Sequence, residues 1–233
     1  MAATRLDSLT DPPVTTVPTL LPVDWTAADL QQHLGGIPLE RIRMVPPPGT
    51  ATEEDVLTAE SRIGRICELI DGVLVEKAMG YYESRLAIVL AHLLEAFRDR
   101  HDMGIVLGEA GTLKVLPKQV RIPDVCFIRW EKFPNRELPR SPIPALAPDL
   151  AVEILSEGNT EGEMQRKLRD YFAAGVRLVW YIDPPTRTAR VFTAPEQCLP
   201  LDQEGTLQGG DVLPGFELPL KELFARAGRQ GPA

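Results

Sequence analysis

Apolar and polar residues alternate along the chain in patterns that predict two long helices. Between residues 79 and 102 the apolar side chains recur at steps of three and four, the spacing of a helix with one buried stripe. A second helix is predicted at 160–174. Thr160 and Glu163 form the pattern of a capping box at its start, and Gly175 is a stop signal just after its end.

Other segments have the patterns of β-strands. In CELIDGVLVEK two apolar runs flank Asp71-Gly72, which predicts a tight hairpin. The run LVWYI is apolar throughout, which is typical of a strand that is covered on both faces. Six strands are predicted after the first long helix, at 105–109, 112–116, 122–128, 150–155, 178–182 and 189–192.

The order of these elements predicts the fold class. A strand, a helix and another strand between residues 150 and 182 imply a right-handed parallel crossover. The strands before it are predicted to form an antiparallel meander. We therefore expect an α/β sandwich with a mixed sheet at 52–226, in which an extra hairpin precedes the core and a β extension follows it.

The N-terminal part differs in composition from this domain. Of the 22 prolines in the chain, which outnumber the 18 glycines, eight lie in the first 50 residues. Pro46 to Pro48 cannot donate backbone hydrogen bonds, so they predict a connector or an edge on the surface. We expect residues 1–51 to form a proline-rich arm with a short helix at 25–34, and residues 227–233 to form a tail.

Composition and charge narrow the class of protein. The chain has 33 acidic and 25 basic side chains and a formal net charge of -8, which excludes a protein that binds nucleic acid by being basic all over. No apolar run is long enough for a membrane helix, and the start lacks the pattern of a secretory signal. Three widely spaced cysteines predict neither a disulfide framework nor a cysteine zinc site. We expect a cytoplasmic protein.

Two carboxylates are predicted to lie inside the sheet. Asp124 is in the segment RIPDVCFI, and Glu153 is surrounded by apolar residues in DLAVEILS. A buried carboxylate is unfavourable unless it is paired or holds a metal. If the two strands are neighbours, the carboxylates converge and offer oxygen ligands that suit Mg²⁺. Lys167, on the helix after Glu153, is the candidate that would orient a water molecule, with Tyr171 one turn along the same face.

Each of these residues also has a structural interpretation. Asp124 could be a strand-start residue that is fixed by Pro123. Glu153 could be the ion-pair partner of a buried arginine, such as Arg121 or Arg129. Lys167 could be a solvated residue on the surface of its helix.

The sequence resembles the Uma-two family of restriction endonucleases, which belongs to the PD-(D/E)XK nuclease superfamily. The upstream CELIDGVLVEK and the downstream GGDVLPGFELPLKELF also resemble that family, so the likeness extends over roughly residues 52–225. The resemblance implies a core of a helix, three antiparallel strands, a helix and a further strand. It is carried by Pro123-Asp124, by PDLAVEILS with Glu153 and Ser156, and by Lys167, Tyr171, Gly175, Trp180 and Asp183-Pro184.

The resemblance also implies roles for these residues. Asp124 and Glu153 would bind the metal, Mg²⁺ or Mn²⁺. The sequence departs from the motif at Leu155, where a lysine would follow the glutamate by two residues. Lys167 is the expected migrated replacement, with Gln165 as a substitute.

A further acid is expected on the first helix of the core, because the superfamily often carries one there. Glu83 fits that place. Many Uma-two members have a histidine there instead. Glu68 in the hairpin is a second candidate, ranked lower because its strand lies outside the common core.

Two functions are consistent with these features. The first is a Mg²⁺-dependent endonuclease that hydrolyses DNA and works as a homodimer when it cuts both strands. The second is a nuclease fold that no longer cuts and serves as a binding or assembly module, as Leu155 and the acidic balance suggest. For the nuclease, contacts to DNA phosphates are expected from two basic clusters, Lys114, Lys118 and Arg121, and Arg166, Lys167 and Arg169.

Overall fold

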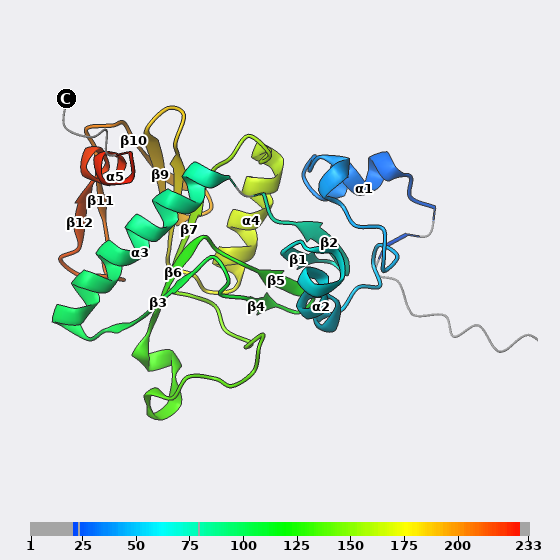
Figure 1. Ribbon diagram of the computed structural model, residues 1–233, viewed down its shortest axis with the longest axis horizontal. Coiled ribbons are helices and arrows are strands. Elements are labelled where there is room, and N and C mark those ends of the chain that lie inside the picture. The colour runs from blue at the N-terminus through cyan, green and yellow to red at the C-terminus, as the bar shows by residue number, and fades with distance from the viewer. Residues whose placement is uncertain (1–20, 23, 79, 229–233) are drawn as a thin grey trace, which may run out of the picture.

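A computed structural model describes residues 21–22, 24–78 and 80–228 (Figure 1). These residues form two large β-sheets, a third sheet of two strands, and the helices that pack on them. The larger sheet has six strands in the order β10-β9-β8-β7-β6-β3. Only β7 and β8 pair in parallel, so the sheet is mixed, as predicted. Its strands are β3 (Gly104–Gly108), β6 (Val125–Arg129), β7 (Leu150–Ile154), β8 (Leu178–Asp183), β9 (Thr188–Ala194) and β10 (Gln197–Leu201).

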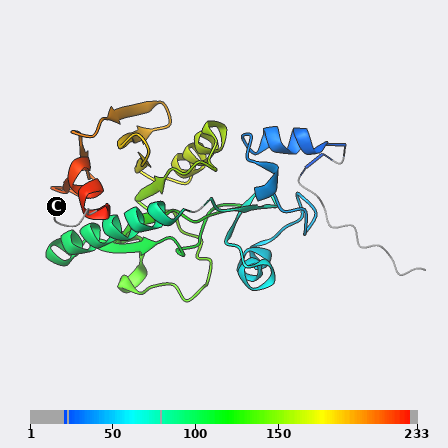
Figure 2. The ribbon, with the colours of Figure 1, turned by 45° about the horizontal axis from the view of Figure 1, so that its top comes forward.

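Helices cover both faces of this sheet (Figure 2). Helix α3 (Tyr81–His101) packs with its apolar stripe on one face, together with α5 (Leu220–Ala227). Helix α4 (Glu161–Ala173) packs on the opposite face. The predicted helix at 79–102 is α3, although residue 79 lies outside the described residues. The predicted capping box of α4 is present, since Thr160 and Glu163 bond each other's backbone N–H groups.

The smaller sheet has the order β2-β1-β5-β4, with strands β1 (Cys67–Ile70), β2 (Val73–Glu76), β4 (Leu113–Leu116) and β5 (Gln119–Arg121). Helix α2 (Glu53–Ile63) packs on one of its faces. The predicted hairpin is present, and both turn residues, Asp71 (φ 49°) and Gly72 (φ 75°), are left-handed. Gly72 is needed for a second reason, because a Cβ there would lie 2.6 Å from the backbone of Gly49.

The strand predicted at 122–128 forms only from Val125, as β6, and the strand β5 (Gln119–Arg121) just before it was not predicted. Strand β5 ends at Arg121 in the smaller sheet, and β6 begins at Val125 in the larger one. Pro123 has no N–H to give to a ladder. The Ile122 N–H instead donates to the Glu68 carboxylate (2.9 Å). The chain therefore crosses between the sheets immediately before Asp124.

The described part of the predicted arm packs against the hairpin and α4. Helix α1 (Ala27–His33) and the 3₁₀ helix η1 (Leu39–Arg41) precede the hairpin. Apolar residues of α1 and of the segments that flank η1 form a shared core with β1 and β2. Arg41 donates to both Glu163 oxygens (2.9 and 2.7 Å), to the Gly158 carbonyl (2.6 Å) and to the Glu76 carbonyl (2.8 Å). The arm is thus tied to the start of α4. Residues 1–20 and most of the predicted tail lie outside the described residues.

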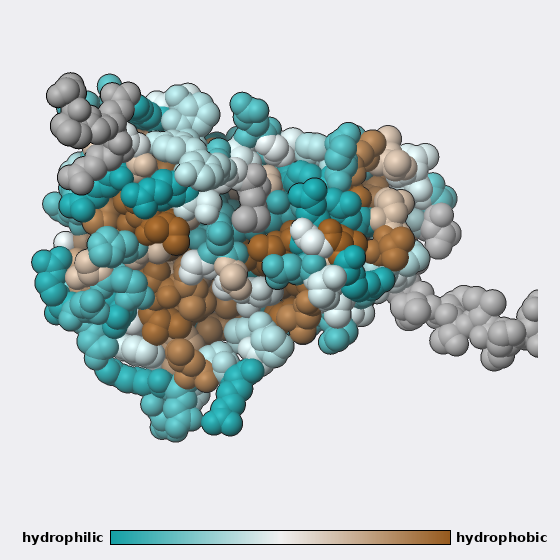
Figure 3. All heavy atoms as spheres, viewed as in Figure 1, coloured by the Kyte–Doolittle hydropathy of each residue, from teal (hydrophilic) through white to brown (hydrophobic). Residues whose placement is uncertain are grey.

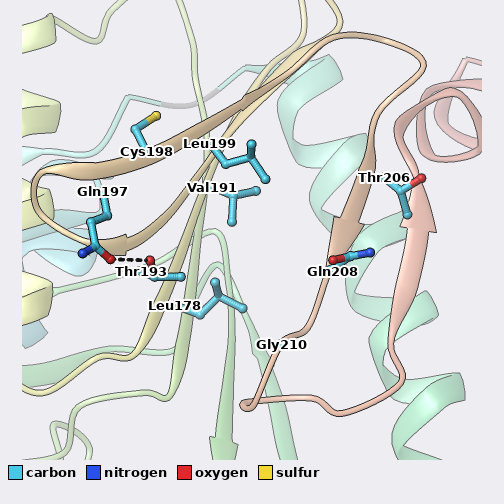
Figure 4. A pocket seen from close by; sticks show the side chains of 9 residues that line it. All are labelled: Leu178, Val191, Thr193, Gln197, Cys198, Leu199, Thr206, Gln208 and Gly210. Carbon is cyan, nitrogen blue, oxygen red and sulfur yellow. Dashed lines mark hydrogen bonds between the residues drawn. The ribbon is translucent and has the colours of Figure 1, made fainter.

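The C-terminal extension is the hairpin of β11 (Thr206–Gln208) and β12 (Glu217–Pro219), followed by α5. A groove of about 410 Å³ lies between β11 and the edge of the larger sheet, with Leu178, Val191 and Leu199 on its apolar side (Figure 4). Hydrophobic residues also reach the surface in the region of β3 and β6 (Figure 3). None of the described helices is both long and apolar enough to cross a membrane.

Candidate active site

Asp124 and Glu153 lie opposite each other on neighbouring antiparallel strands. Val125 pairs with Val152, so the register places Asp124 beside Glu153, and the Asp124 N–H donates to the Val152 carbonyl (3.0 Å). The Asp124 carboxylate accepts a further bond from the Ile154 N–H (2.6 Å). Both side chains lie on the face of the sheet that α4 covers, and they alternate with Val125 and Val152, which face α3. The neighbouring strands that the sequence argument required are therefore present.

Helix α4 brings Lys167 and Tyr171 to Glu153. Lys167 Nζ lies 2.8 Å from Glu153 Oε2, and the Tyr171 hydroxyl donates to Glu153 Oε1. Four residues separate Lys167 from Tyr171, about one helical turn, so both side chains leave the same face of α4. All three side chains are buried, with Glu153 5% and Lys167 4% exposed. The interpretation of Lys167 as a solvated surface residue is therefore wrong.

Glu68 in β1 belongs to the same cluster. Its Oε1 lies 3.0 Å from Lys167 Nζ, and its Oε2 accepts from Arg121 Nη1 (2.9 Å). Arg121 also pairs with Asp170 of α4. The smaller sheet thus supplies an acid that shares Lys167 with Glu153. The lower ranking of Glu68 rested on its strand being outside the common core, yet the two sheets meet at this point.

Lys77 is a site residue that the sequence argument missed. It directly follows β2, and its Nζ lies 2.9 Å from Asp124 Oδ1. The side chain is almost fully buried. The sequence did hold one signal for such a residue. The candidate buried carboxylates outnumbered the candidate cations near them, and each buried carboxylate requires a partner. A lysine at the end of a strand nevertheless looks like a solvated residue in the sequence.

The electrostatics of the cluster differ between its two glutamates. Burial raises the pKa of Glu153 to about 7, and the charges of Asp124 and Glu68 add to this effect against the opposing charge of Lys167. Burial also disfavours the charge of Glu68, but Lys167 and Arg121 overcome it and lower its pKa to about 2. Burial opposes the charge of Lys167, yet its two glutamate partners hold its pKa above the ordinary value.

The charge balance of the cluster bears on metal binding. Four carboxylates (Glu68, Asp124, Glu153 and Asp170) face three cations (Lys77, Arg121 and Lys167), which leaves one net negative charge when all are ionised. Burial is the main cause of the raised pKa of Glu153, and a bound cation would offset the repulsion from Asp124 and Glu68 that adds to it. In the described part of the chain, no group of three or more His, Cys, Asp or Glu side chains is arranged to hold a metal. Asp124 and Glu153 fit a hard cation that takes its other ligands from water and phosphate.

The remaining predicted residues lie elsewhere. Glu83 is in the first turn of α3, where its carboxylate lies so close to Gly80 that a Cβ there would be 1.9 Å from it. Among the described contacts, Glu83 has none with the cluster. Gln165 donates to Glu161 (2.8 Å) rather than to Glu153. Arg121 is 1% exposed and bound to acids, so it cannot contact a DNA phosphate as expected.

Surface access to the cluster is limited. The Asp124 side chain is 14% exposed, more than those of Lys77, Glu153 and Lys167. A cleft of about 300 Å³ runs beside the loop after β7, and Leu155, Ser156 and Arg190 are among the residues that line it. Leu155, at the position of the motif lysine, therefore lines this cleft and leaves the contact with Glu153 to Lys167.

Comparisons with known proteins agree with this fold. No curated protein matches the chain significantly. One similar solved structure is that of "a putative nuclease belonging to DUF820" from Anabaena variabilis ATCC 29413. It is 20% identical, covers 70% of this chain and 92% of its own, and superposes with a TM-score of 0.63, which supports a shared fold. Residues 54–221 match the Uma2 family, described as "Putative restriction endonuclease", and the chain therefore belongs to that family.

Proposed function

We propose that this protein is a metal-dependent endonuclease that hydrolyses DNA phosphodiester bonds. Asp124 and Glu153 would bind Mg²⁺ or Mn²⁺, and Lys167 would assist the attacking water. The observation that carries the proposal is the 2.8 Å contact between Lys167 Nζ and Glu153. It brings an ammonium group to the carboxylate pair although Leu155 occupies the motif position.

Lys167, Tyr171 and Glu68 would have separate roles in this reaction. When bound, the cation supplies Lewis acidity and a more acidic water. Lys167 would donate a hydrogen bond to the attacking water and would offset the negative charge that develops on the phosphate. Tyr171 donates to Glu153 and fixes its orientation. Glu68 holds Lys167 from the other side (3.0 Å), so that the ammonium stays in place.

The alternative is a nuclease fold that no longer cuts and serves as a binding or assembly module. The burial of Glu153 and Lys167 favours it, because every carboxylate of the cluster is already paired within the protein. Under this alternative the cluster stabilises the junction of the two sheets and has no substrate.

Cleavage assays distinguish the two. The purified chain would be incubated with supercoiled plasmid, linear duplex, single-stranded DNA and RNA, each with Mg²⁺, Mn²⁺ or a chelator. We expect metal-dependent cleavage of DNA that falls by about 100-fold or more in Asp124→Asn, Glu153→Gln and Lys167→Met. Light scattering on the same samples would test the homodimer that cutting both strands requires.

The matched control is Glu131→Gln, which removes an exposed carboxylate that pairs with Arg129 away from the cluster. This variant should cut like the unaltered chain. If the unaltered chain leaves every substrate intact with both metals, the binding module is the better account. If the three site variants cut as fast as the control, the assigned residues are wrong.

A further inference from the structure

The two lysines of the cluster are held differently. Lys167 Nζ lies between two carboxylates, Glu153 (2.8 Å) and Glu68 (3.0 Å). Lys77 Nζ forms an ion pair with Asp124 (2.9 Å), and in the described part of the chain it has no second carboxylate at ion-pair distance and no hydrogen-bond acceptor in good geometry. If Glu153 bound another cation, Lys167 would still have Glu68 as an ion-pair partner. Lys77 would lose its one partner.

The oxygens of Asp124 are both in use. Oδ2 accepts from the Ile154 N–H (2.6 Å), which orders the carboxylate against β7. Oδ1 faces Lys77. Oδ1 is therefore the atom that is free of backbone bonds and would point to a ligand, and the ammonium of Lys77 lies beside it. The stem of Lys77 is buried, so the ammonium cannot move into solvent by a simple rotation.

We infer that Lys77 is a built-in competitor for the divalent cation at Asp124, an inference that rests on the proposed metal site. In the metal-free chain Lys77 neutralises Asp124 and stabilises the junction of the sheets. A cation that binds Asp124 must displace or repel this ammonium, because two positive centres on one carboxylate oxygen repel each other. The chain consequently binds its metal weakly, and Lys77 sets the concentration at which the site fills.

The test is the affinity for Mn²⁺ and Mg²⁺, measured by calorimetry on the full chain. Removing the ammonium in Lys77→Met should tighten metal binding by about tenfold or more. The ion pair that the metal must break is intermediate in strength between a surface pair and a buried pair. Lys77→Arg keeps the charge and should bind metal like the unaltered chain. Asp124→Asn should abolish binding in either background.

Thermal unfolding supplies a second measurement that does not depend on cleavage. Lys77→Met should melt at a lower temperature than the unaltered chain in chelator and gain more from added Mn²⁺, because binding to the folded state stabilises it. The matched control is Lys132→Met, which removes the lysine that pairs with buried Asp149 (3.2 Å). It should also melt lower in chelator, but gain no more from Mn²⁺ than the unaltered chain does.

Several outcomes would overturn the inference. Metal affinity that is unchanged or weaker in Lys77→Met shows that Lys77 does not compete. Cleavage that falls with unchanged affinity shows that Lys77 instead acts on the reacting phosphate. If the unaltered chain and every variant bind no metal, the metal site itself fails, and the inference fails with it. If the unaltered chain binds metal and Lys77→Met does so no more tightly, the proposed function stands and the competitor role alone is refuted.

Discussion

The raised pKa of Glu153 predicts an unusual pH dependence of stability. An unfolded chain protonates a glutamate near 4.5, whereas burial raises the pKa of Glu153 to about 7 in the folded protein. The folded state therefore binds the proton more tightly between these values. Stability from this group is fully present below pH 4.5 and is lost as the pH rises through 7. The difference amounts to about 3 kcal/mol in the free energy of unfolding.

The perturbation that tests this reasoning is Glu153→Gln, because a neutral amide mimics the protonated acid. Urea unfolding in chelator at pH 5, 6, 7 and 8 would give the free energy of unfolding of both chains. We expect the unaltered chain to lose about 2.5 kcal/mol more than the variant between pH 5 and pH 8, because part of the effect is already lost at pH 5. Added Mg²⁺ should flatten the curve of the unaltered chain, since it favours the ionised carboxylate.

The matched control is Glu163→Gln, which changes another buried glutamate, one that pairs with Arg41 (2.7 Å). This change should lower stability by a similar amount at every pH in the series. Curves for Glu153→Gln and the unaltered chain that run parallel from pH 5 to pH 8 would refute the reasoning. They would show that Lys167 keeps Glu153 ionised throughout the range.

Three further predictions concern stability and can be checked by urea unfolding at pH 7. Arg41→Ala leaves the buried Glu163 unpaired and should cost about 3 kcal/mol; a loss below 1 kcal/mol would mean that the arm is not clamped to α4. Gly72→Ala should cost at least about 1 kcal/mol, because the turn is left-handed and a Cβ would meet Gly49 at 2.6 Å, and a neutral result would contradict that contact. Leu223→Ala, at a fully buried position of α5, should cost roughly 2–5 kcal/mol; no effect would place α5 outside the cooperative core.

Features with a local signal could be predicted from the sequence. The stripe of α3, the capping box of α4 and the Asp71-Gly72 turn each depend on residues a few positions apart, and all are present. Strand β5 and the late start of β6 at Val125 could not be predicted, because they depend on where two sheets diverge. Pro123 was a hint, yet a proline also occurs at strand starts.

The residues of the candidate site, like the elements of the fold, could be predicted only in part. Asp124, Glu153 and Lys167 follow from buried acids and one helix face. Glu68 had the same signal as Glu153, an acid inside the apolar run CELI, but its strand joins a second sheet and meets Lys167 only through the tertiary fold. The role of Lys77 depends on that junction too, and no sequence spacing encodes it.

The clamp of Arg41 also bears on how the chain folds during synthesis. Its partner Glu163 is 122 residues further along, and the Thr160 hydroxyl reaches back 125 residues to the Gly35 carbonyl. Such distant contacts form slowly, because the entropy of the chain between the two residues must be lost before the contact can stabilise the fold. The described arm and the hairpin leave the ribosome long before α4 does. Their charged side chains that pair with α4, such as Arg41, therefore stay unpaired until more than two thirds of the chain has been made. Assembly of the cluster around Glu153 and Lys167 is therefore a late event, and an incomplete chain cannot form it.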